Sequence, residues 1–352
     1  MRAADHHNNF GALRLFFAAL VVLSHAPWLV DGDLHREPLT RAFGTITFGD
    51  LAVDGFFLVS GYLVTQSWQS TADPLAYLWR RILRIYPGFV VASLVSLFIV
   101  GPLVGGDLSR LGAGGFATLA ARMLVLQGPK LPGAFAALPV PHLNGSLWTI
   151  GFEFRCYLLV MLVGAIGLFR RRRLIAAAAG ALLAASLVGP LAGLPPPVAL
   201  VVGWLQVTVR FTALFAAGAT FFLFRDLVVY SARLAFAAGA GLIAALFTPL
   251  AEIGVALFGG YLIFWAALHL KSRWLARINA RADLSYGLYL YAWPLTNGLV
   301  LLFPGMSPWL IFAFTLAAGL GLAWVSWRLV EKPALNLKDA VPWRSVRMVV
   351  AR

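Results

Sequence analysis

Long apolar runs recur along the whole chain, separated by short polar or Pro- and Gly-containing breaks. Each run is about 18 to 24 residues long, which is enough for an α-helix to cross the hydrocarbon core of a bilayer, whereas a strand of a membrane β-barrel needs only about ten. Because lipid offers no hydrogen-bond partners to an exposed backbone, a lipid-facing run of this length must be helical. The pattern predicts an all-α integral membrane protein, a bundle of transmembrane helices in a lipid bilayer.

Composition agrees with this prediction. Of the 352 residues, 61% are hydrophobic and 12% are charged, compared with about 45–50% and about 25% in soluble domains. The net charge of +14 is compatible with nucleic-acid binding, but the basic residues cluster in alternate breaks, as orientation signals do. We therefore expect no nucleic-acid partner. The single cysteine, Cys156, cannot form an intrachain disulfide.

We predict about ten spans, near residues 10–30, 46–68, 86–104, 145–169, 174–193, 199–223, 233–249, 252–270, 284–303 and 308–329. If the N-terminus is cytoplasmic, most of the 28 Lys and Arg residues fall on the inner side, and this bias predicts that both termini are cytoplasmic. We expect residues 1–335 to form a single transmembrane domain and residues 336–352 a basic cytoplasmic tail.

Two stretches lie outside the predicted spans. Residues 73–85 place apolar side chains at helical spacing with arginines between them, which predicts a short amphipathic helix at the inner membrane surface. Residues 105–144 are rich in Gly, Pro and Ala and are longer than a connector needs to be. We expect this segment to form a lid or a platform for an acceptor substrate.

Arg14 and His25 are the ionisable pair in the first predicted span. Eleven residues bring both side chains to one face of a helix, about 16 Å apart. Ionisable groups within a span are costly and are functional candidates by default. His25 is a candidate general base, or a neutral histidine hydrogen-bonded between helices. Arg14 is a candidate to bind an anion or orient a partner, or an arginine that extends to the inner surface.

Asp54 opens the segment DGFFLVSGYL in the second predicted span. A buried carboxylate needs a partner, and His25 and Arg14 are the nearest candidates in the sequence. Ser60 and Gly61 in this segment offer a hydroxyl and a close backbone approach, although small residues in membrane helices usually serve packing.

Glu153 lies two residues before Arg155. Two residues turn a helix by about 200°, so the two side chains point to opposite sides and each needs a partner elsewhere. Glu153 is a candidate to orient His25 or receive its proton, with a structural salt bridge as the alternative. Glu331, at the end of the last predicted span, is expected to be structural.

Arg80, Arg81 and Arg84 lie on the predicted amphipathic helix. Guanidinium groups at this spacing suit phosphate or pyrophosphate oxygens, or the headgroups of anionic lipids. We expect no metal site, since the histidines are scattered and the cysteine has no companion.

Together these segments resemble the acyltransferase-3 family of bacterial membrane O-acyltransferases, from about residue 8 to residue 335. Arg14 and His25 match the family's Arg-x10-His. Five further segments match in order: AVDGFFLVSGYL, RILRIYP, SLWTIGFEFRCY, SYGLYLYAWP and VEKP. Ala292 stands where many members have histidine, so a role for that histidine cannot be carried over.

The resemblance implies an acyltransferase of the bacterial inner membrane that moves an acyl group, usually acetyl, from cytoplasmic acyl-CoA (acetyl-CoA) to a hydroxyl of a carbohydrate or glycolipid acceptor on the outer side. The expected catalytic residues are His25, Glu153, Asp54 and Arg14. The expected CoA-binding residues are Arg14, Arg80, Arg81, Arg84, Ser60, Gly61 and Tyr62. The expected acceptor-binding residues are His142, Trp148, Tyr286 and Tyr289.

Several alternatives stay open at this point. The acyl group can be acetyl, succinyl or longer, and transfer can be direct or pass through an acyl-histidine. Some family members carry a fused esterase-like domain, whereas this chain ends soon after its last predicted span, so it is expected to act alone, as a homo-oligomer or with a separate periplasmic partner. The alternative function is a proton-coupled transporter of a lipid-linked sugar or small anion, with Arg14, His25 and Glu153 along its path.

Overall fold

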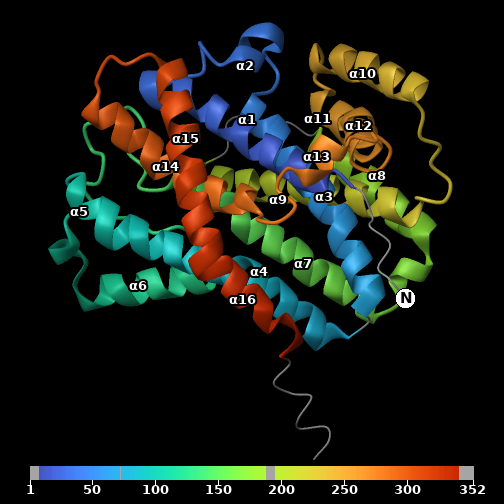
Figure 1. The fold of residues 1–352 in the computed structure, drawn as a ribbon, viewed down its shortest axis with the longest axis horizontal. Coiled ribbons are helices and arrows are strands. Elements are labelled where there is room, and N and C mark those ends of the chain that lie inside the picture. The colour runs from blue at the N-terminus through green and yellow to red at the C-terminus, as the bar shows by residue number, and fades with distance from the viewer. Residues whose placement is uncertain (1–7, 72, 188–194, 341–352) are drawn as a thin grey trace, which may run out of the picture. The chain divides into compact units, whose positions relative to one another are not determined.

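The structure is a computed structural model that describes residues 8–71, 73–187 and 195–340. Within these ranges the secondary structure is entirely helical, as predicted (Figure 1). The chain forms two compact units. The first unit comprises the described residues within 1–28, 33–67 and 166–285, and the second comprises those within 29–32, 68–165 and 286–352.

The first unit is built mainly from α1 (Phe10–Asp31), α2 (Pro38–Phe43), α3 (Phe48–Thr71), α8 (Arg172–Ser186), α9 (Pro196–Leu223), α10 (Ala232–Leu246), α11 (Ala251–Gly254), α12 (Gly260–Leu268) and α13 (Arg273–Arg277). A π-helical turn, Val255–Gly259, joins α11 to α12 without a break.

The second unit is built mainly from α4 (Pro74–Val95), α5 (Gly101–Leu103), α6 (Gly112–Leu124), α7 (Ile150–Ala165), α14 (Leu284–Leu302), α15 (Pro308–Ser326) and α16 (Lys332–Asn336). π-Helical turns over Ser96–Val100 and Trp327–Glu331 join α4 to α5 and α15 to α16. A 3-10 turn, Gly145–Thr149, leads into α7.

Seven helices in the described ranges are long and apolar enough to cross a membrane. They are Phe10–Asp31, Phe48–Thr71, Pro74–Leu103, Gly145–Ala165, Val198–Leu223, Ala251–Leu268 and Pro308–Asp339. The chain is therefore a multi-span membrane protein, but the predicted count of about ten is not confirmed.

The other three predicted spans fall on shorter or more polar helices. α8 and α10 have 15 residues each, and part of the predicted span 174–193 lies outside the described residues. α14 has 19 residues, but its tyrosines and its Ser, Thr and Asn side chains lower its mean hydropathy.

The predicted short amphipathic helix is not a separate element, and this expectation was wrong. One helix runs without a break over Pro74–Leu103, 30 residues. It begins where Asp73 accepts hydrogen bonds from the backbone N–H groups of the first turn, with Pro74 at the first helical position. Pro87 does not end this helix, because a proline within a helix removes only one backbone hydrogen bond, a loss that packing can offset.

Glycines allow α3 and α9 to pack backbone against backbone in the first unit. A Cβ on Gly61 would lie 2.0 Å from the carbonyl oxygen of Phe215, and a Cβ on Gly218 would lie 2.0 Å from that of Leu58. Only glycine fits at such distances, and small residues at contacts are typical of membrane helices. The same pairing of helices brings Arg210 of α9 to the acidic first half of α3.

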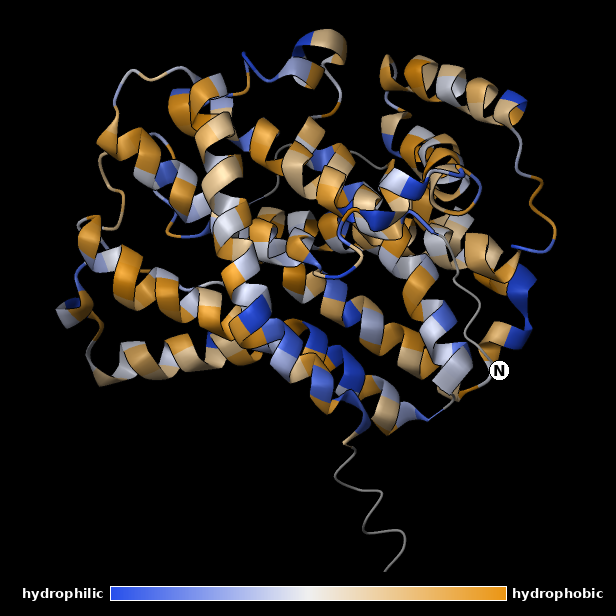
Figure 2. Ribbon diagram, viewed as in Figure 1, coloured by the Kyte–Doolittle hydropathy of each residue, from blue (hydrophilic) through white to orange (hydrophobic). Residues whose placement is uncertain are grey.

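The segment 105–144, predicted as a lid or platform, packs into a small apolar core of the second unit with the π-helical turn Ser96–Val100 that follows α4. Its buried members are Leu97, Leu119, Leu131, Ala134, Phe135 and Leu143. A backbone hydrogen bond from Phe135 to Val104, 3.0 Å, fixes the loop to the end of α5. Figure 2 shows that the helices of this unit are hydrophobic along most of their length, whereas the start of α4 and α16 are hydrophilic.

Candidate functional site

Arg14 pairs with an acidic residue that our sequence analysis did not single out. Its Nη2 atom lies 3.2 Å from Oδ2 of Asp283, which is nearly buried. Asn279 donates a hydrogen bond from Nδ2 to Oδ1 of Asp283, 3.0 Å, and Ser285 Oγ donates to the same oxygen. Asp283 is therefore held from several sides, and it fixes the position of the Arg14 guanidinium.

A cavity of about 640 Å³ lies beside Arg14 in the first unit. Its lining residues are Asn8, Phe10, Gly11, Arg14, Tyr62, Leu63, Gln66, Leu268, Ala276, Ile278, Asn279 and Ala280. The cavity brings together Arg14 and Tyr62, two of the residues that the family resemblance assigns to CoA binding. Ser60 and Gly61 do not line the cavity. Gly61 instead packs against α9, the role in helix packing that the sequence analysis gave as its alternative.

His25 lies where α1 packs closely against the first turn of α3. A Cβ on Gly49 would be 3.1 Å from Ser24 Oγ, so the two backbones approach each other next to His25 and Asp50. The imidazole is partly buried, its ring centroid is 5.9 Å from that of Trp28, and the charge of Asp50 acts on it. The structure thus places a carboxylate in the environment of the candidate base.

Arg210 on α9 holds three carboxylates. Its Nη2 atom donates hydrogen bonds of 2.9 and 3.0 Å to the two carboxylate oxygens of Asp54, and Nη1 donates to Asp50, 3.4 Å. Its Nε atom lies 3.1 Å from Glu252 Oε1. This arrangement, the Arg210 cluster, ties α3, α9 and α11 together by charge.

The partner of Asp54 is therefore Arg210, and not the sequence neighbours His25 or Arg14 that we considered for it. Nearness in the sequence is a poor guide because helix packing, here through Gly61 and Gly218, decides which side chains meet. A signal was present, since Arg210 is a charge in the middle of a predicted span and such a residue requires a partner.

Aromatic rings surround the arginines of α4 in the second unit. The Arg81 guanidinium lies 5.8 Å from the ring centroid of Tyr77 and 5.7 Å from that of Tyr157. The Arg84 guanidinium lies 5.7 Å from the ring centroid of Tyr286. Cation–π contacts hold a guanidinium plane without using its N–H donors, so they are compatible with the predicted binding of phosphate oxygens.

Arg80 has different surroundings. It donates a hydrogen bond to Thr71 Oγ1, 3.2 Å, and lies 3.6 Å from the carboxylate of Asp339. Both contacts tie the start of α4 to side chains of neighbouring segments, including Leu337–Asp339 that follows α16. Residues 341–352 of the predicted tail lie outside the described residues.

Glu153 belongs to a chain of contacts that leads to the arginines of α4. The Tyr157 hydroxyl donates to Glu153 Oε1, 2.6 Å, and the Tyr77 hydroxyl donates to the carbonyl of Tyr157, 3.0 Å. The charges of Arg81, Arg84 and Glu153 all act on the Tyr157 phenol. The predicted role of Glu153 toward His25 stays a prediction.

Glu331 is nearly buried at the end of a π-helical turn, where Ser326 donates to it, 3.0 Å. The Tyr286 phenol is within reach of the charges of Glu331, Glu153 and Arg84. The Tyr286 hydroxyl donates to the carbonyl of Ile85, 2.8 Å. This tyrosine, predicted to bind an acceptor, thus lies beside the residues predicted to bind CoA.

The other predicted acceptor residues lie further along the second unit. The Tyr289 hydroxyl shares a hydrogen bond with Thr149, 2.6 Å, and the exposed Trp148 ring contacts Phe152. The carbonyl of His142 accepts hydrogen bonds from Trp293 Nε1, 2.9 Å, and Asn297 Nδ2, 3.2 Å. Since Trp293 is two turns of α14 beyond Tyr286, the structure does not gather all four residues in one place.

Ala292, at the family's histidine position, is buried on α14. Its carbonyl accepts a hydrogen bond from Thr296, 2.8 Å.

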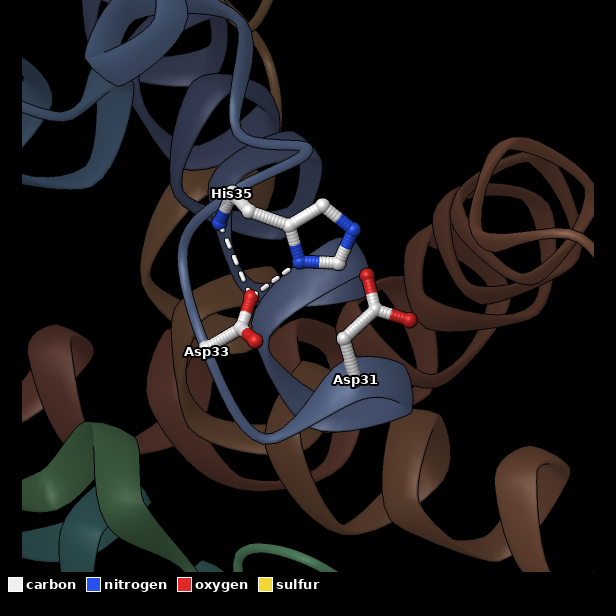
Figure 3. Close-up of side chains that lie close together, drawn as sticks. All are labelled: Asp31, Asp33 and His35. Carbon is white, nitrogen blue, oxygen red and sulfur yellow. Dashed lines mark hydrogen bonds and ion pairs between the residues drawn. The ribbon is translucent and has the colours of Figure 1, made fainter.

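Within the residues that the structure describes, a group of side chains at the end of α1 and in the turn after it has the spacing of a metal site. One ligand atom from each of Asp31, Asp33 and His35 lies within 4.8 Å of the others (Figure 3). The His35 backbone N–H and ring Nδ1 are hydrogen-bonded to Asp33, and these bonds hold the pKa of Asp33 below its usual value. Exposed acidic groups of this kind are common without a metal, so the group does not by itself assign one.

Comparison with known proteins adds independent findings. The family model of an acyltransferase domain, Acyl_transf_3, matches residues 7–328. The chain is 27% identical over 394 aligned positions to Nodulation protein 10 of Rhizobium leguminosarum bv. viciae, with 96% of each chain covered. It is 28% identical over 154 positions to the O-acetyl transferase of Shigella phage Sf6, which covers 43% of this chain and 44% of the relative. No solved structure matches the chain.

Proposed function

This chain belongs to the acyltransferase-3 family and is a membrane-embedded acyltransferase, and we propose that it transfers an acetyl group from cytoplasmic acetyl-CoA to a hydroxyl of an extracytoplasmic or lipid-linked carbohydrate. The name of the phage relative, an O-acetyl transferase, supports acetyl as the acyl group and oxygen as the acceptor atom. The observation that carries the proposal is that Arg14, which begins the family's Arg-x10-His motif, lines a cavity large enough for a substrate group.

The proposed topology places the donor and the acceptor on opposite sides of the inner membrane. Both termini are cytoplasmic, and α8, α10 and α14 complete about ten membrane passages together with the seven longer helices. The cavity beside Arg14 and the arginine-rich start of α4 then belong to the cytoplasmic side. His25, about 16 Å further along α1 than Arg14, lies toward the outer side.

In the proposed mechanism, His25 accepts the proton of the acceptor hydroxyl as its oxygen attacks the thioester carbonyl carbon. A C–O bond forms, the C–S bond breaks, and the proton passes from His25 to the departing CoA sulfur. The imidazolium that forms in between is stabilised by the carboxylate of Asp50 in the same unit, whose charge acts on His25. Arg81 and Arg84 of the second unit hold CoA phosphate oxygens through their N–H groups.

The test is acetyl transfer by purified protein in nanodiscs, measured as the release of free CoA thiol. His25→Ala should lower turnover at least about 100-fold, the usual contribution of a general base. His35→Ala, in the exposed turn after α1, is the matched control and should keep wild-type turnover. Thermal unfolding must show that both variants are folded. Turnover of His25→Ala close to wild type would remove the base assignment.

The same assay separates an acyltransferase from a transporter. A proton-coupled transporter would leave acetyl-CoA unconsumed and, in sealed vesicles, would move a sugar or anion across the membrane. Consumption of acetyl-CoA that depends on His25 supports transfer. The acceptor can be identified by mass spectrometry of cell-envelope glycans from a strain that lacks the protein.

A further inference from the structure

Four polar residues form a buried group in the second unit, which we call the Asn144 cluster. Ser93 and Ser96 are one helical turn apart, in α4 and in the π-helical turn that follows it. Asn144 comes directly before the turn Gly145–Thr149, and Ser146 lies within that turn. The exposed fractions of these four residues are between 0 and 7%, so any polar atom among them depends on a partner inside the protein.

The side-chain amide of Asn144 links the cluster to α14. Its Nδ2 atom donates hydrogen bonds to the carbonyl of Leu290, 2.9 Å, and to Ser96 Oγ, 3.3 Å. Both N–H groups are thus used, and because a carbonyl only accepts, Oδ1 is the amide atom that faces away from Leu290.

Three atoms of the cluster lack a hydrogen-bond partner within the described part of the chain. They are Asn144 Oδ1 and the hydroxyls of Ser93 and Ser146. Native proteins rarely leave buried polar atoms unpaired, because nothing then offsets their loss of water. The three atoms therefore indicate a ligand that supplies the hydrogen bonds.

The chemistry of these atoms favours a ligand with hydroxyl groups. Asn144 Oδ1 requires a donor, whereas a serine hydroxyl can donate or accept, and an O–H group of a ligand can meet both needs. The cluster has no charged member, so it favours a neutral ligand over a phosphate or a carboxylate, which binds best to a cation. Two sources have this chemistry, namely buried water and the hydroxyls of a carbohydrate.

Neighbouring contacts hold Asn144 and Ser146 in place. Gly145 between them lies against the Trp293 ring, where a Cβ would be 2.4 Å from a ring atom. Trp293 Nε1 also donates to the carbonyl of His142, 2.9 Å. His142 is exposed, whereas Asn144, two residues later, is buried, so the chain reaches the cluster directly from an exposed segment. A site that is already formed loses little conformational entropy when it binds a ligand.

We propose that the Asn144 cluster binds hydroxyl groups of the carbohydrate acceptor, other than the hydroxyl that is acetylated. The inference rests on the proposed function, which takes a carbohydrate as the acceptor. In the proposed topology the cluster belongs to the outer half of the membrane, the side from which the acceptor comes. Trp148, in the same turn as Ser146, is 53% exposed. An aromatic ring beside hydrogen-bonding groups suits both the C–H and the O–H groups of a sugar, whereas water requires no such ring.

The experiment uses Ser93→Ala and Ser146→Ala, singly and together, in full-length protein in nanodiscs. The acceptor probe is the unacetylated envelope-glycan fraction of a strain that lacks the protein, and KM is measured separately for this fraction and for acetyl-CoA. We expect each variant to raise the KM for the glycan fraction about three- to tenfold, the effect of one lost hydrogen bond, and to leave the KM for acetyl-CoA unchanged. The unfolding temperature should stay the same or rise, because the hydroxyls that are removed have no partner in the protein.

The matched control is Thr296→Val, which removes a buried hydroxyl of the same unit outside the cluster. Thr296 donates to the carbonyl of Ala292, 2.8 Å, and is hydrogen-bonded to Thr315, 3.2 Å. This variant should lower the unfolding temperature and leave the KM for the glycan fraction unchanged, so it separates a loss of stability from a loss of acceptor binding.

The other outcomes would overturn the inference. If the KM for the glycan fraction stays unchanged in both serine variants, the cluster does not bind the acceptor, and a lower unfolding temperature would then assign it to water alone. If the KM for acetyl-CoA rises by the same factor, the effect is not specific to the acceptor. If the wild-type protein consumes acetyl-CoA without acetylating the glycan fraction, the inference fails while the acyltransferase assignment stands. If it consumes no acetyl-CoA, the proposed function fails as well.

Discussion

Replacing Arg210 with methionine should destabilise the first unit, because it leaves Asp54 buried without a counter-charge. Breaking a buried ion pair by removing one partner costs about 3–5 kcal/mol. The Asp54 side chain is 0% exposed, and both of its carboxylate oxygens accept hydrogen bonds from Arg210. Water cannot replace these bonds without opening the contact between α3 and α9.

The other two carboxylates of the Arg210 cluster should contribute much less to this loss. The side chains of Asp50 and Glu252 are 43% and 32% exposed, so both can be hydrated when the guanidinium is removed. Thr47 also donates to Asp50 through its hydroxyl, 2.7 Å, and its backbone N–H, 3.2 Å. We therefore assign most of the expected 3–5 kcal/mol to Asp54 (an order-of-magnitude value).

The assay is the free energy of unfolding in mixed micelles, measured for Arg210→Met, Asp54→Leu and the double variant. Removing both partners leaves an apolar contact, so the double variant should recover much of the stability that Arg210→Met loses. A loss in Arg210→Met below about 0.5 kcal/mol, typical of a surface substitution, would refute this account. So would a double variant that is less stable than either single variant.

Three further predictions test other parts of the structure. Gly218→Ala should cost about 1–3 kcal/mol, because its Cβ would lie 2.0 Å from a backbone oxygen of α3, whereas Gly203→Ala on the same helix meets nothing within 4 Å and should be neutral or stabilising in thermal unfolding. Arg84→Ala should weaken CoA binding about tenfold or more in calorimetry, and unchanged affinity would remove its assignment to phosphate. The hydrogen bond from Arg172 lowers the pKa of Asp226, so this pair should add stability above the aspartate's unfolded pKa, and the protein should lose it as the pH falls below about 4. Thermal unfolding of Asp226→Asn should lack this acid-side loss, and identical pH profiles would contradict the assignment.

The sequence was sufficient to predict the helical class and most of the long spans, because the length of an apolar run and the thickness of a bilayer are directly linked. It failed at the start of α4. Arginines between apolar residues suggested a separate amphipathic helix, but the structure has one helix over Pro74–Leu103. Patterns of polarity do not reveal whether a helix continues from a membrane surface into the core.

Individual site residues could be picked out from the sequence, but their partners could not. A charge within a span identifies Arg14, Asp54 and Arg210 as unusual. Which residue pairs with which depends on helix packing, so Asp283 and Arg210 emerged as partners only in the structure. The family motif likewise selected Tyr62, while the identity of Gln66 as its neighbour in the cavity required coordinates.

The π-helical turn at Trp327–Glu331 makes one contact sensitive to the exact number of residues in the chain. Ser326 and Glu331 are five positions apart and are hydrogen-bonded, whereas in a regular α-helix five steps amount to about 500°, which would place them roughly 140° apart around the axis. The wider turn realigns them. A deletion of one amino acid between these two residues would restore the ordinary winding and leave them four positions apart, on one face of a regular helix, whereas an added residue would leave them six positions apart, about 120° from each other around the axis.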